Sequence, residues 1–313
     1  MRVSIDCRYI RERPSGIGAY TRALLDRVPA LAPNDHFHLW ADPRAPQPLC
    51  DAPNVAQTVV RAPANGLRTL LSPARLVDLS GVDVLHAPFN TLGRGLRCAC
   101  VVTVHDVMWV VRPDLCGGIS PVTPLRAAYY RLGIMGALRQ AARLIAISQA
   151  TADSIALIAP EASSRVRVIP HGVEARFQPP EDREVVRAHL RQHLRLARPY
   201  LLVIGQNAPY KNHVAVLRAF AAARFDQPVE LLMLQRLYAR GSRLTFGVDR
   251  LDHRAQDLGV ADRVRFICGL RDDEVLKLFL KHPSSPDSLP LELPSANLLA
   301  ISPSGEILTT QPR

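Results

Sequence analysis

The amino-acid sequence predicts an α/β protein made of two doubly wound domains that face a cleft, the second of them incomplete. The chain has 313 residues, which is more than one hydrophobic core usually supports. Short β-branched runs alternate with helix-periodic segments from Val3 to Ile169, as in parallel βαβ units. The alternation restarts at Tyr200 but yields only three strands, whereas a doubly wound, Rossmann-like domain usually has about five or six.

The first series of elements is predicted from periodicity and from helix-start signals. Apolar residues recur at three- and four-residue spacing from Ile17 to Leu31, which predicts one helix. Ser72-Pro73 is expected to start another, because proline suits the first helical position. Thr123-Pro124 opens the longest helix, to about residue 142, and a further helix runs from Gln149 to Pro160. The predicted strands are Val3–Cys7, Phe37–Trp40, Val55–Val60, Val82–His86, Ala99–His105, Arg143–Ser148 and Val166–Ile169.

The second series follows a polar, arginine-rich stretch with a proline at each end. We interpret residues 179–199 as an interdomain linker between an N-terminal domain over residues 1–178 and a partial C-terminal domain over 200–281. The elements expected in the latter are strands at 200–205, 229–234 and 264–268 and helices at 212–224, 248–258 and 272–281.

The last segment of the chain loses this pattern. Residues 282–313 hold six prolines and six serines and no aromatic residue, so we expect an atypical, disordered tail that builds no sheet. Because the domain before it is also unfinished, we expect that the chain is truncated or that its reading frame was lost near Leu280.

Composition restricts the partners of the protein. The net charge is +11 with 39 basic residues, of which only three are lysines. The basic residues are spread along the chain, so no nucleic-acid partner is expected, while attraction to an anionic ligand or membrane surface stays open. The six cysteines form no C-x-x-C pair and are interpreted as reduced thiols.

The compartment is predicted from what the N-terminal sequence lacks. No stretch reaches the ~18 apolar residues of a membrane span. Asp6 and Arg8 interrupt any apolar signal-peptide region. We expect a cytoplasmic protein, with peripheral contact on the inner face of the membrane as an open alternative.

Two candidate sites follow strands of the first series. Gly16 and Gly18 lie between the first strand and the first helix, where glycines let a phosphate or a sugar hydroxyl approach helix N–H groups. The alternative is simple turn chemistry. His105 and Asp106 end the most buried strand, where they can donate to and accept from substrate hydroxyls. The alternative is a histidine that only hydrogen-bonds backbone. No second histidine or carboxylate stands nearby at ligand spacing, so no metal is expected.

Two further candidate pairs are weaker when each is taken alone. Lys211 and Asn212 open a helix after the strand that ends at Gly205, and a lysine beside a helix N-terminus suits a diphosphate. A solvated lysine is the alternative. His171 and Gly172 close the first half, where a turn glycine with an exposed histidine is the simpler interpretation.

The longest helix, from about 124 to 142, combines arginines with apolar residues. It carries Arg126, Arg131 and Arg139, with Arg143 just after. Such a helix can lie on an anionic membrane. We favour a helix that covers the sheet and turns a solvated basic face outward.

Taken together, the motifs resemble the group 1, family 4 glycosyltransferases of the two-Rossmann-domain (GT-B) architecture. The resemblance covers residues 1–280, in the family's order and spacing. The matching stretches are IDCRYIRERPSGIGAYTRALL at 5–25, DVLHAPFN at 83–90, VVTVHDVMW at 101–109, RLIAISQATADSI at 143–155, RVRVIPHGVEARFQP at 165–179, YLLVIGQNAPYKNHVAVLRAF at 200–220 and LGVADRVRFICGLRDDEVLKLF at 258–279.

The resemblance implies a retaining transfer of a sugar from a nucleotide-sugar donor, without a cofactor or an obligatory metal. The donor would be one such as GDP-mannose, the acceptor a glycan or a lipid-linked molecule, and the context polysaccharide biosynthesis. Residues 1–178 would form the acceptor-side domain and 200–281 the nucleotide-sugar domain. By matching motif, Gly16 and Gly18 would lie near the diphosphate, His105 would contact the donor sugar and Lys211 would bind the diphosphate. Ser148, His171, Gly172 and Gly205 would shape the cleft and hinge.

Two features depart from the family pattern. Tyr210 stands where members often have an arginine. Nothing after Phe279 matches the family's Glu-rich E-x7-E segment, and Glu292 and Glu306 have the wrong spacing. A catalytically inactive relic, or a pseudoenzyme that binds a partner, is therefore the alternative function.

Overall fold

The chain folds into two α/β units. The computed structural model describes residues 1–12, 15–117, 122–173, 182–205, 208–235, 248–270, 274–275, 277–278, 298–301 and 307–309. Unit 1 comprises Met1–Pro113 and Pro124–Gly172, and unit 2 comprises Asp114–Thr123 and Val173–Arg313. The expected first domain, residues 1–178, thus extends past the end of unit 1 and includes a ten-residue segment, 114–123, that groups with unit 2.

Unit 1 is built on a seven-stranded parallel sheet with strand order β3-β2-β1-β4-β5-β6-β7. The chain moves outward from β1 in one direction and then, from β4, in the other, so this is the doubly wound topology that the sequence predicts. The strands are β1 (Arg2–Asp6), β2 (His36–Ala41), β3 (Val55–Val59), β4 (Val84–Ala87), β5 (Ala99–Val104), β6 (Arg143–Ala146) and β7 (Val166–Val168).

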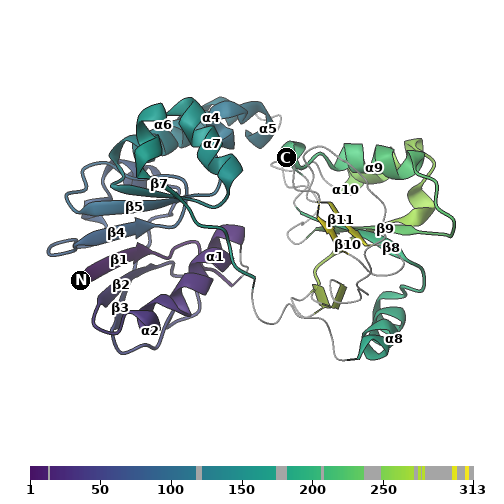
Figure 1. The fold of residues 1–313 in the computed structure, drawn as a ribbon, viewed down its shortest axis with the longest axis horizontal. Coiled ribbons are helices and arrows are strands. Elements are labelled where there is room, and N and C mark those ends of the chain that lie inside the picture. The colour runs from purple at the N-terminus through teal and green to yellow at the C-terminus, as the bar shows by residue number, and fades with distance from the viewer. Residues whose placement is uncertain are drawn as a thin grey trace. The chain divides into compact units, whose positions relative to one another are not determined.

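Helices cover both faces of this sheet (Figure 1). Leu39 and Trp40 are adjacent on β2 and both are buried, but they belong to separate apolar clusters, because successive side chains of a strand point to opposite faces. The helical elements are α1 (Gly16–Leu25), α2 (Val28–Leu31), α3 (Leu67–Leu71), η1 (Pro73–Arg75), α4 (Met108–Val111), α5 (Pro113–Gly117), α6 (Thr123–Gln140), α7 (Gln149–Ile158) and η2 (Pro160–Arg165). Within the described residues, no helix has the length and apolar character needed to cross a membrane.

Two helix predictions in unit 1 are corrected. The helix expected from Ile17 to Leu31 is two helices, because α1 ends at Leu25 and α2 has Pro29 in its first turn. A proline lacks the N–H that would continue the earlier helix. Ser72 does not cap a new helix: α3 ends just before it, and Pro73 starts only a 3₁₀ turn.

Unit 2 holds a five-stranded sheet of order β10-β9-β8-β11-β12. The strands β8 (Tyr200–Ile204), β9 (Glu230–Gln235) and β10 (Val264–Cys268) are parallel and lie where the sequence predicts them. The helical elements are α8 (Arg183–Leu194), η3 (Pro209–Lys211), α9 (His213–Ala222), α10 (Val248–Asp257) and η4 (Ala261–Arg263). Of the helix expected at 272–281, residues 274–275 and 277–278 are described and are helical.

The predicted linker contributes to the core of unit 2. Within residues 179–199, Leu190 of α8 and Leu196 are fully buried, and they cluster with Leu202 of β8 and Leu232 of β9. On the other sheet face, α9 and α10 pack on residues such as Leu231, so α8 is the second helical layer (Figure 1). The polar composition of residues 179–199 does not indicate this packing, because the apolar face of α8 is narrow.

The expectation that residues 282–313 build no sheet is wrong for two short segments. Leu298–Ile301 forms β11, which pairs antiparallel with β8, and Ile307–Thr309 forms β12, which pairs antiparallel with β11. Averaging the composition of the tail concealed these apolar runs, each of which is typical of a short strand. The pairing covers the edge of β8, and an open strand edge is a liability in water. The rest of the tail lies outside the described residues.

A buried ion pair fixes the carboxyl end of β1. The guanidinium of Arg8 is fully buried and donates to both carboxylate oxygens of Asp6, which is itself 3% exposed. It also donates to the Ala62 carbonyl oxygen at 2.8 Å and to Thr69 Oγ1 at 2.9 Å. Its Cζ lies 5.3 Å from the Trp40 ring centroid. Arg8 therefore joins β1, β2, α3 and the segment before α3.

Replacing Arg8 with Met should lower the free energy of unfolding of unit 1 by about 3–5 kcal/mol, because the Asp6 carboxylate would stay buried without its cation. Urea unfolding measures this change. The matched control is Arg254→Met, which breaks the exposed Arg254–Asp257 pair and should alter stability by less than about 1 kcal/mol. Equal effects of the two substitutions would contradict the prediction.

Candidate functional site

Of the predicted site residues of unit 1, the two glycines of the α1 turn and His105 lie beyond the carboxyl ends of β1 and β5, the two neighbours of β4 in the sheet, while Ser148 and His171 follow β6 and β7. This is the edge at which doubly wound sheets bind ligands. The segments after β1, β4 and β5 hold the glycine turn, the stretch from Pro88 to Asn90, and His105. The sheet topology thus brings together residues that lie far apart in the sequence.

Gly16 and Gly18 have different surroundings in the turn that opens α1. A Cβ added to Gly18 would lie 2.4 Å from the carbonyl oxygen of Tyr9, whereas a Cβ on Gly16 would meet no atom within 4 Å. The N-cap is Ser15, whose Oγ accepts from the Gly18 N–H at 3.0 Å. Gly18 is therefore required by close packing of α1 on the end of β1, and the open space at Gly16 leaves room for a ligand.

His105 is held from three sides directly after β5. Its backbone N–H donates to Asn90 Oδ1 at 2.7 Å, and its carbonyl oxygen accepts from Thr151 Oγ1 at 3.3 Å. The ring Nε2 lies 3.0 Å from the Pro88 carbonyl oxygen, so Nε2 carries the proton and donates. Desolvation lowers the pKa of His105, although the bond to Pro88 opposes the shift. The ring is then neutral at neutral pH, and Nδ1 is its acceptor for a hydroxyl.

Three rings meet at this position. The Tyr20 ring of α1 stacks on His171 with centroids 4.8 Å apart and meets His105 edge-on at 5.2 Å. His105 and His171 are themselves 5.4 Å apart in an edge-on arrangement. We call Tyr20, His105 and His171 the ring cluster. The structure thus brings together two of the predicted residues, His105 and His171, and adds Tyr20.

The buried hydroxyl of Thr103 holds the ring cluster through a hydrogen bond to Tyr20. Thr103 Oγ1 of β5 lies 3.0 Å from the Tyr20 hydroxyl and 3.0 Å from His86 Nε2 of β4. A hydroxyl can donate one hydrogen bond and accept another, so Thr103 satisfies both neighbours. Desolvation lowers the pKa of His86 to about 4, so the network contains a neutral imidazole. These bonds fix the Tyr20 ring against His105.

The remaining predicted residues of unit 1 have structural contacts. Asp106 Oδ1 accepts from the Met108 N–H at 3.0 Å and so stabilises the start of α4. Ser148 is the N-cap of α7, and its Oγ accepts from the Thr151 N–H at 3.2 Å. Because Thr151 in turn donates to His105, Ser148 supports the position of His105 indirectly. Gly172 ends unit 1, yet its φ is not positive and a Cβ there would meet no atom within 4 Å.

In unit 2, Lys211 and Asn212 stand at the N-terminus of α9. Asn212 has φ 50° and its side chain makes no capping hydrogen bond. The first N–H groups of α9 therefore lack a side-chain cap, and with the positive end of the helix dipole they favour an anion. The Lys211 Nζ lies 5.5 Å from the Tyr210 ring centroid. At the end of β8, a Cβ on Gly205 would lie 4.0 Å from Lys211 Cδ.

His213, the first residue of α9, was not among the predicted residues. It is 4% exposed, and its Nδ1 is buried with no hydrogen-bond partner among the described residues. Desolvation, and then the charge of Lys211, lower the pKa of His213 to about 4. The imidazole is therefore neutral and adds an unpaired polar atom to this helix start.

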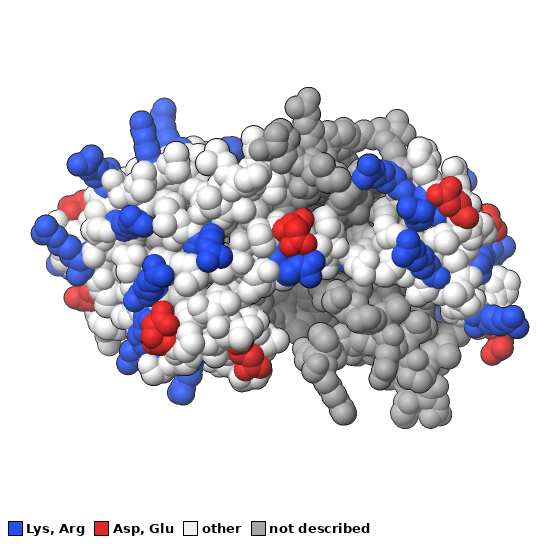
Figure 2. All heavy atoms as spheres, turned by 90° about the horizontal axis from the view of Figure 1, so that it is seen from above, with Lys and Arg blue, Asp and Glu red and all other residues white. Residues whose placement is uncertain are grey.

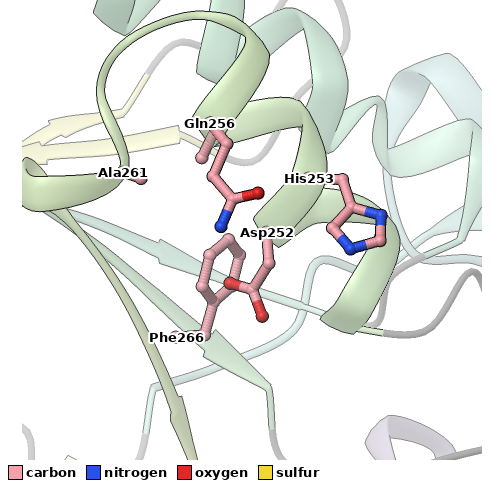
Figure 3. A pocket seen from close by; sticks show the side chains of 6 residues that line it. Asp252, His253, Gln256, Ala261 and Phe266 are labelled. Atoms are coloured by element: carbon pink, nitrogen blue, oxygen red, sulfur yellow. The ribbon is translucent and has the colours of Figure 1, made fainter.

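A groove elsewhere in unit 2 contains none of the predicted residues. It has a volume of about 400 Å³ and is lined by Asp252, His253, Ala255, Gln256, Ala261 and Phe266. In Figure 3 the side chains of Asp252 and Gln256 reach from α10 over the Phe266 ring, while His253 points to the side. Among the described residues, no three His, Cys, Asp or Glu side chains could hold a metal ion. That the protein needs no metal stays a prediction.

Sequence reasoning missed Tyr20, Asn90 and His86 for identifiable reasons. Tyr20 shares the three- and four-residue spacing of the apolar face of α1, so the pattern does not set it apart as a site residue. Asn90 follows the end of β4 by three positions, and the expectation that ligands bind beyond strand ends could have found it. His86 lies within its strand and carries no signal of its own.

The two glycines of the α1 turn should respond differently to alanine. Gly18→Ala should destabilise unit 1 by about 1–3 kcal/mol, since the new Cβ would press on backbone. Gly16→Ala should leave stability unchanged or raise it by up to about 1 kcal/mol. Thermal and urea unfolding of the two variants compare them directly, and equal losses would refute the assignment.

Comparison with known proteins gives the relationship of the chain. The family model of Glycosyltransferase Family 4 matches residues 14–177, just over half of the chain. D-inositol 3-phosphate glycosyltransferase of Mycolicibacterium gilvum (strain PYR-GCK) is 27% identical over 260 residues, which are 75% of this chain and 55% of that protein. The chain therefore spans little more than half the length of this curated relative.

Solved structures share the fold at low identity. Sucrose-phosphate synthase from Thermosynechococcus elongatus superposes with a TM-score of 0.63 at 18% identity, over 90% of this chain and 73% of the other. WaaG, a glycosyltransferase involved in lipopolysaccharide biosynthesis, gives 0.61 at 17% identity, over 88% and 72%. Anabaena HepE in complex with UDP and glucose gives 0.56 at 18% identity, over 90% and 72%. With this shared architecture and a family match across nearly all of unit 1, the chain belongs to Glycosyltransferase Family 4.

Proposed function

We propose that the protein transfers a sugar from a nucleotide-sugar donor to a hydroxyl of a glycan or a lipid-linked acceptor, with retention of configuration and without a metal. The proposal joins the family membership to the ring cluster of unit 1 and to the α9 start of unit 2. In the reaction, the bond between the sugar and the diphosphate breaks and a bond to the acceptor oxygen forms. The sugar gains positive charge as the diphosphate leaves with negative charge.

The observation that carries the proposal is the arrangement of His105. A neutral imidazole whose Nε2 already donates to a carbonyl oxygen offers Nδ1 as an acceptor to a sugar hydroxyl. Tyr20 and His171 stack on each other beside it, and both meet the imidazole edge-on. These contacts hold the ring in place, and a fixed acceptor orients one hydroxyl of a sugar. Gly16 supplies open space at the start of α1.

The start of α9 is the proposed diphosphate site. Lys211 provides a cation, and the uncapped helix N-terminus provides backbone N–H groups. Both would stabilise the leaving diphosphate more strongly as its charge grows, which lowers the barrier to transfer. For the donor, we favour GDP-mannose on family resemblance and test UDP-glucose beside it, since UDP-glucose is bound in a structure of Anabaena HepE.

One observation favours a second candidate, an inactive relic that retains the fold. In a doubly wound sheet, the strand beyond β8 would continue the parallel order, yet β11 pairs with β8 antiparallel. Nothing after Phe279 matches the E-x7-E segment. An inactive relic would bind donors weakly or not at all. A melting temperature that does not change across millimolar GDP-mannose, UDP-glucose and other nucleotide-sugars would favour this candidate over sugar transfer.

Lys211→Ala should slow transfer by about 10²–10³-fold, by analogy with other preorganised groups that stabilise developing charge. The measurement is release of the nucleoside diphosphate with the preferred donor. Arg224→Ala removes an exposed cation just past the opposite end of α9 and should leave the rate within about twofold. A similar loss in both variants would point to general charge, not to a site at Lys211.

His105→Gln distinguishes the function of Nδ1 from that of Nε2. The glutamine amide can still donate to the Pro88 carbonyl oxygen but offers no acceptor in the place of Nδ1. We expect a melting temperature within a few degrees of the wild type and a loss of transfer of at least about 10²-fold. A variant that stays stable and fully active would remove Nδ1 from the mechanism.

A further inference from the structure

The helix α6 has two apolar faces, of which only one packs against the protein. Ile134, Ala137 and Leu138 are fully buried in the main cluster of unit 1. On the opposite side, Leu125 is 75% exposed and Leu132 is 43% exposed. Ala128 lies between them on the same stripe and is also exposed, since positions three and four apart share a helix face. A helix that covers a sheet needs one apolar face, so covering the sheet does not account for the outer stripe.

Two further apolar side chains are exposed in the segments just before this helix. Val122 directly precedes α6 and is 50% exposed, and Val111 of α4 is 40% exposed. The sequence predicts a solvated basic outer face for this helix. The structure corrects that expectation, because the outer face of α6 is apolar with arginines at its margins.

The charges on α6 are all positive. The helix contains Arg126, Arg131 and Arg139 and no acidic residue, and Arg143 follows it at the start of β6. Arg131 and Arg139 are exposed beside the leucine stripe, while the Arg126 guanidinium lies 5.4 Å from the Trp109 ring centroid. Figure 2 looks onto the side of unit 1 on which α6 lies in Figure 1, and there blue side chains clearly outnumber red ones.

We propose that Leu125, Ala128 and Leu132, flanked by Arg131 and Arg139, dock unit 1 on an anionic lipid bilayer. Leucines on such a helix enter the boundary between headgroups and acyl chains, and arginines bind lipid phosphates. Charge complementarity selects this occupant. A second copy of the same face would bring like charges together, which opposes a symmetric dimer. The inference is independent of sugar transfer, since it concerns only attachment to the bilayer.

The test is cosedimentation of the full chain with vesicles of phosphatidylcholine alone or of an equal mixture with phosphatidylglycerol. We expect binding to the anionic vesicles, with little on the zwitterionic ones. Arg131→Gln with Arg139→Gln should weaken binding by about fivefold for each arginine. Leu125→Ser with Leu132→Ser should weaken it by about tenfold or more.

Matched controls use exposed side chains outside α6. Leu31→Ser removes a leucine of α2 that is 81% exposed, and Arg27→Gln with Arg224→Gln removes two exposed arginines. Both should bind as the wild type does. Melting temperatures confirm folding, and if the leucine pair fails to fold, the arginine pair decides the test. Three results would overturn the proposal: no binding by the wild type, equal binding to both vesicle types, or binding that persists in the α6 variants. Leucine variants that abolish a dimer without changing vesicle binding would assign the face to a second copy instead.

Discussion

The functional edge of unit 1 depends on the ion pair between Asp6 and Arg8. Arg8 is fully buried and its guanidinium joins the end of β1 to Ala62 before α3, to Thr69 within α3 and to the Trp40 ring. Tyr9 follows directly, and its carbonyl oxygen is the atom on which Gly18 packs. The position of α1 on the end of β1 therefore depends on the Asp6–Arg8 ion pair. The contact of Tyr20 with His105 depends in turn on the position of α1.

Much of this arrangement could be predicted because it follows from local pattern and topology. The apolar runs at Ala99–Val104 and Tyr200–Ile204 are strands, as predicted, and parallel order places the residue after each strand at one edge. His105 and Lys211 could be identified as candidates on that ground alone. The hydrogen bonds of His105 could not, because its partners Asn90 and Pro88 come from the segment after β4 and are set by packing.

Other features escaped prediction because they depend on tertiary context. Tyr20 has the spacing of a core residue and only the neighbouring rings show its second function. Leu190 lies in a polar stretch. That α8 packs there is shown only by the apolar sheet face that it covers. The outer stripe of α6 has the same periodicity as the inner one, so sequence alone could not tell which leucines are covered.

The antiparallel pairing of β11 with β8 also affects the order in which unit 2 is completed. β8 is the central strand of its sheet, but one of its two partners is synthesised roughly 95 residues after it. During translation, β9 and β10 are synthesised before β11, so β9 can pair with β8 first. The backbone N–H and C=O groups on the other side of β8 stay unpaired until β11 is made. Nascent chains in this interval expose an unpaired strand edge, so a chaperone that covers it would improve the yield of the folded protein.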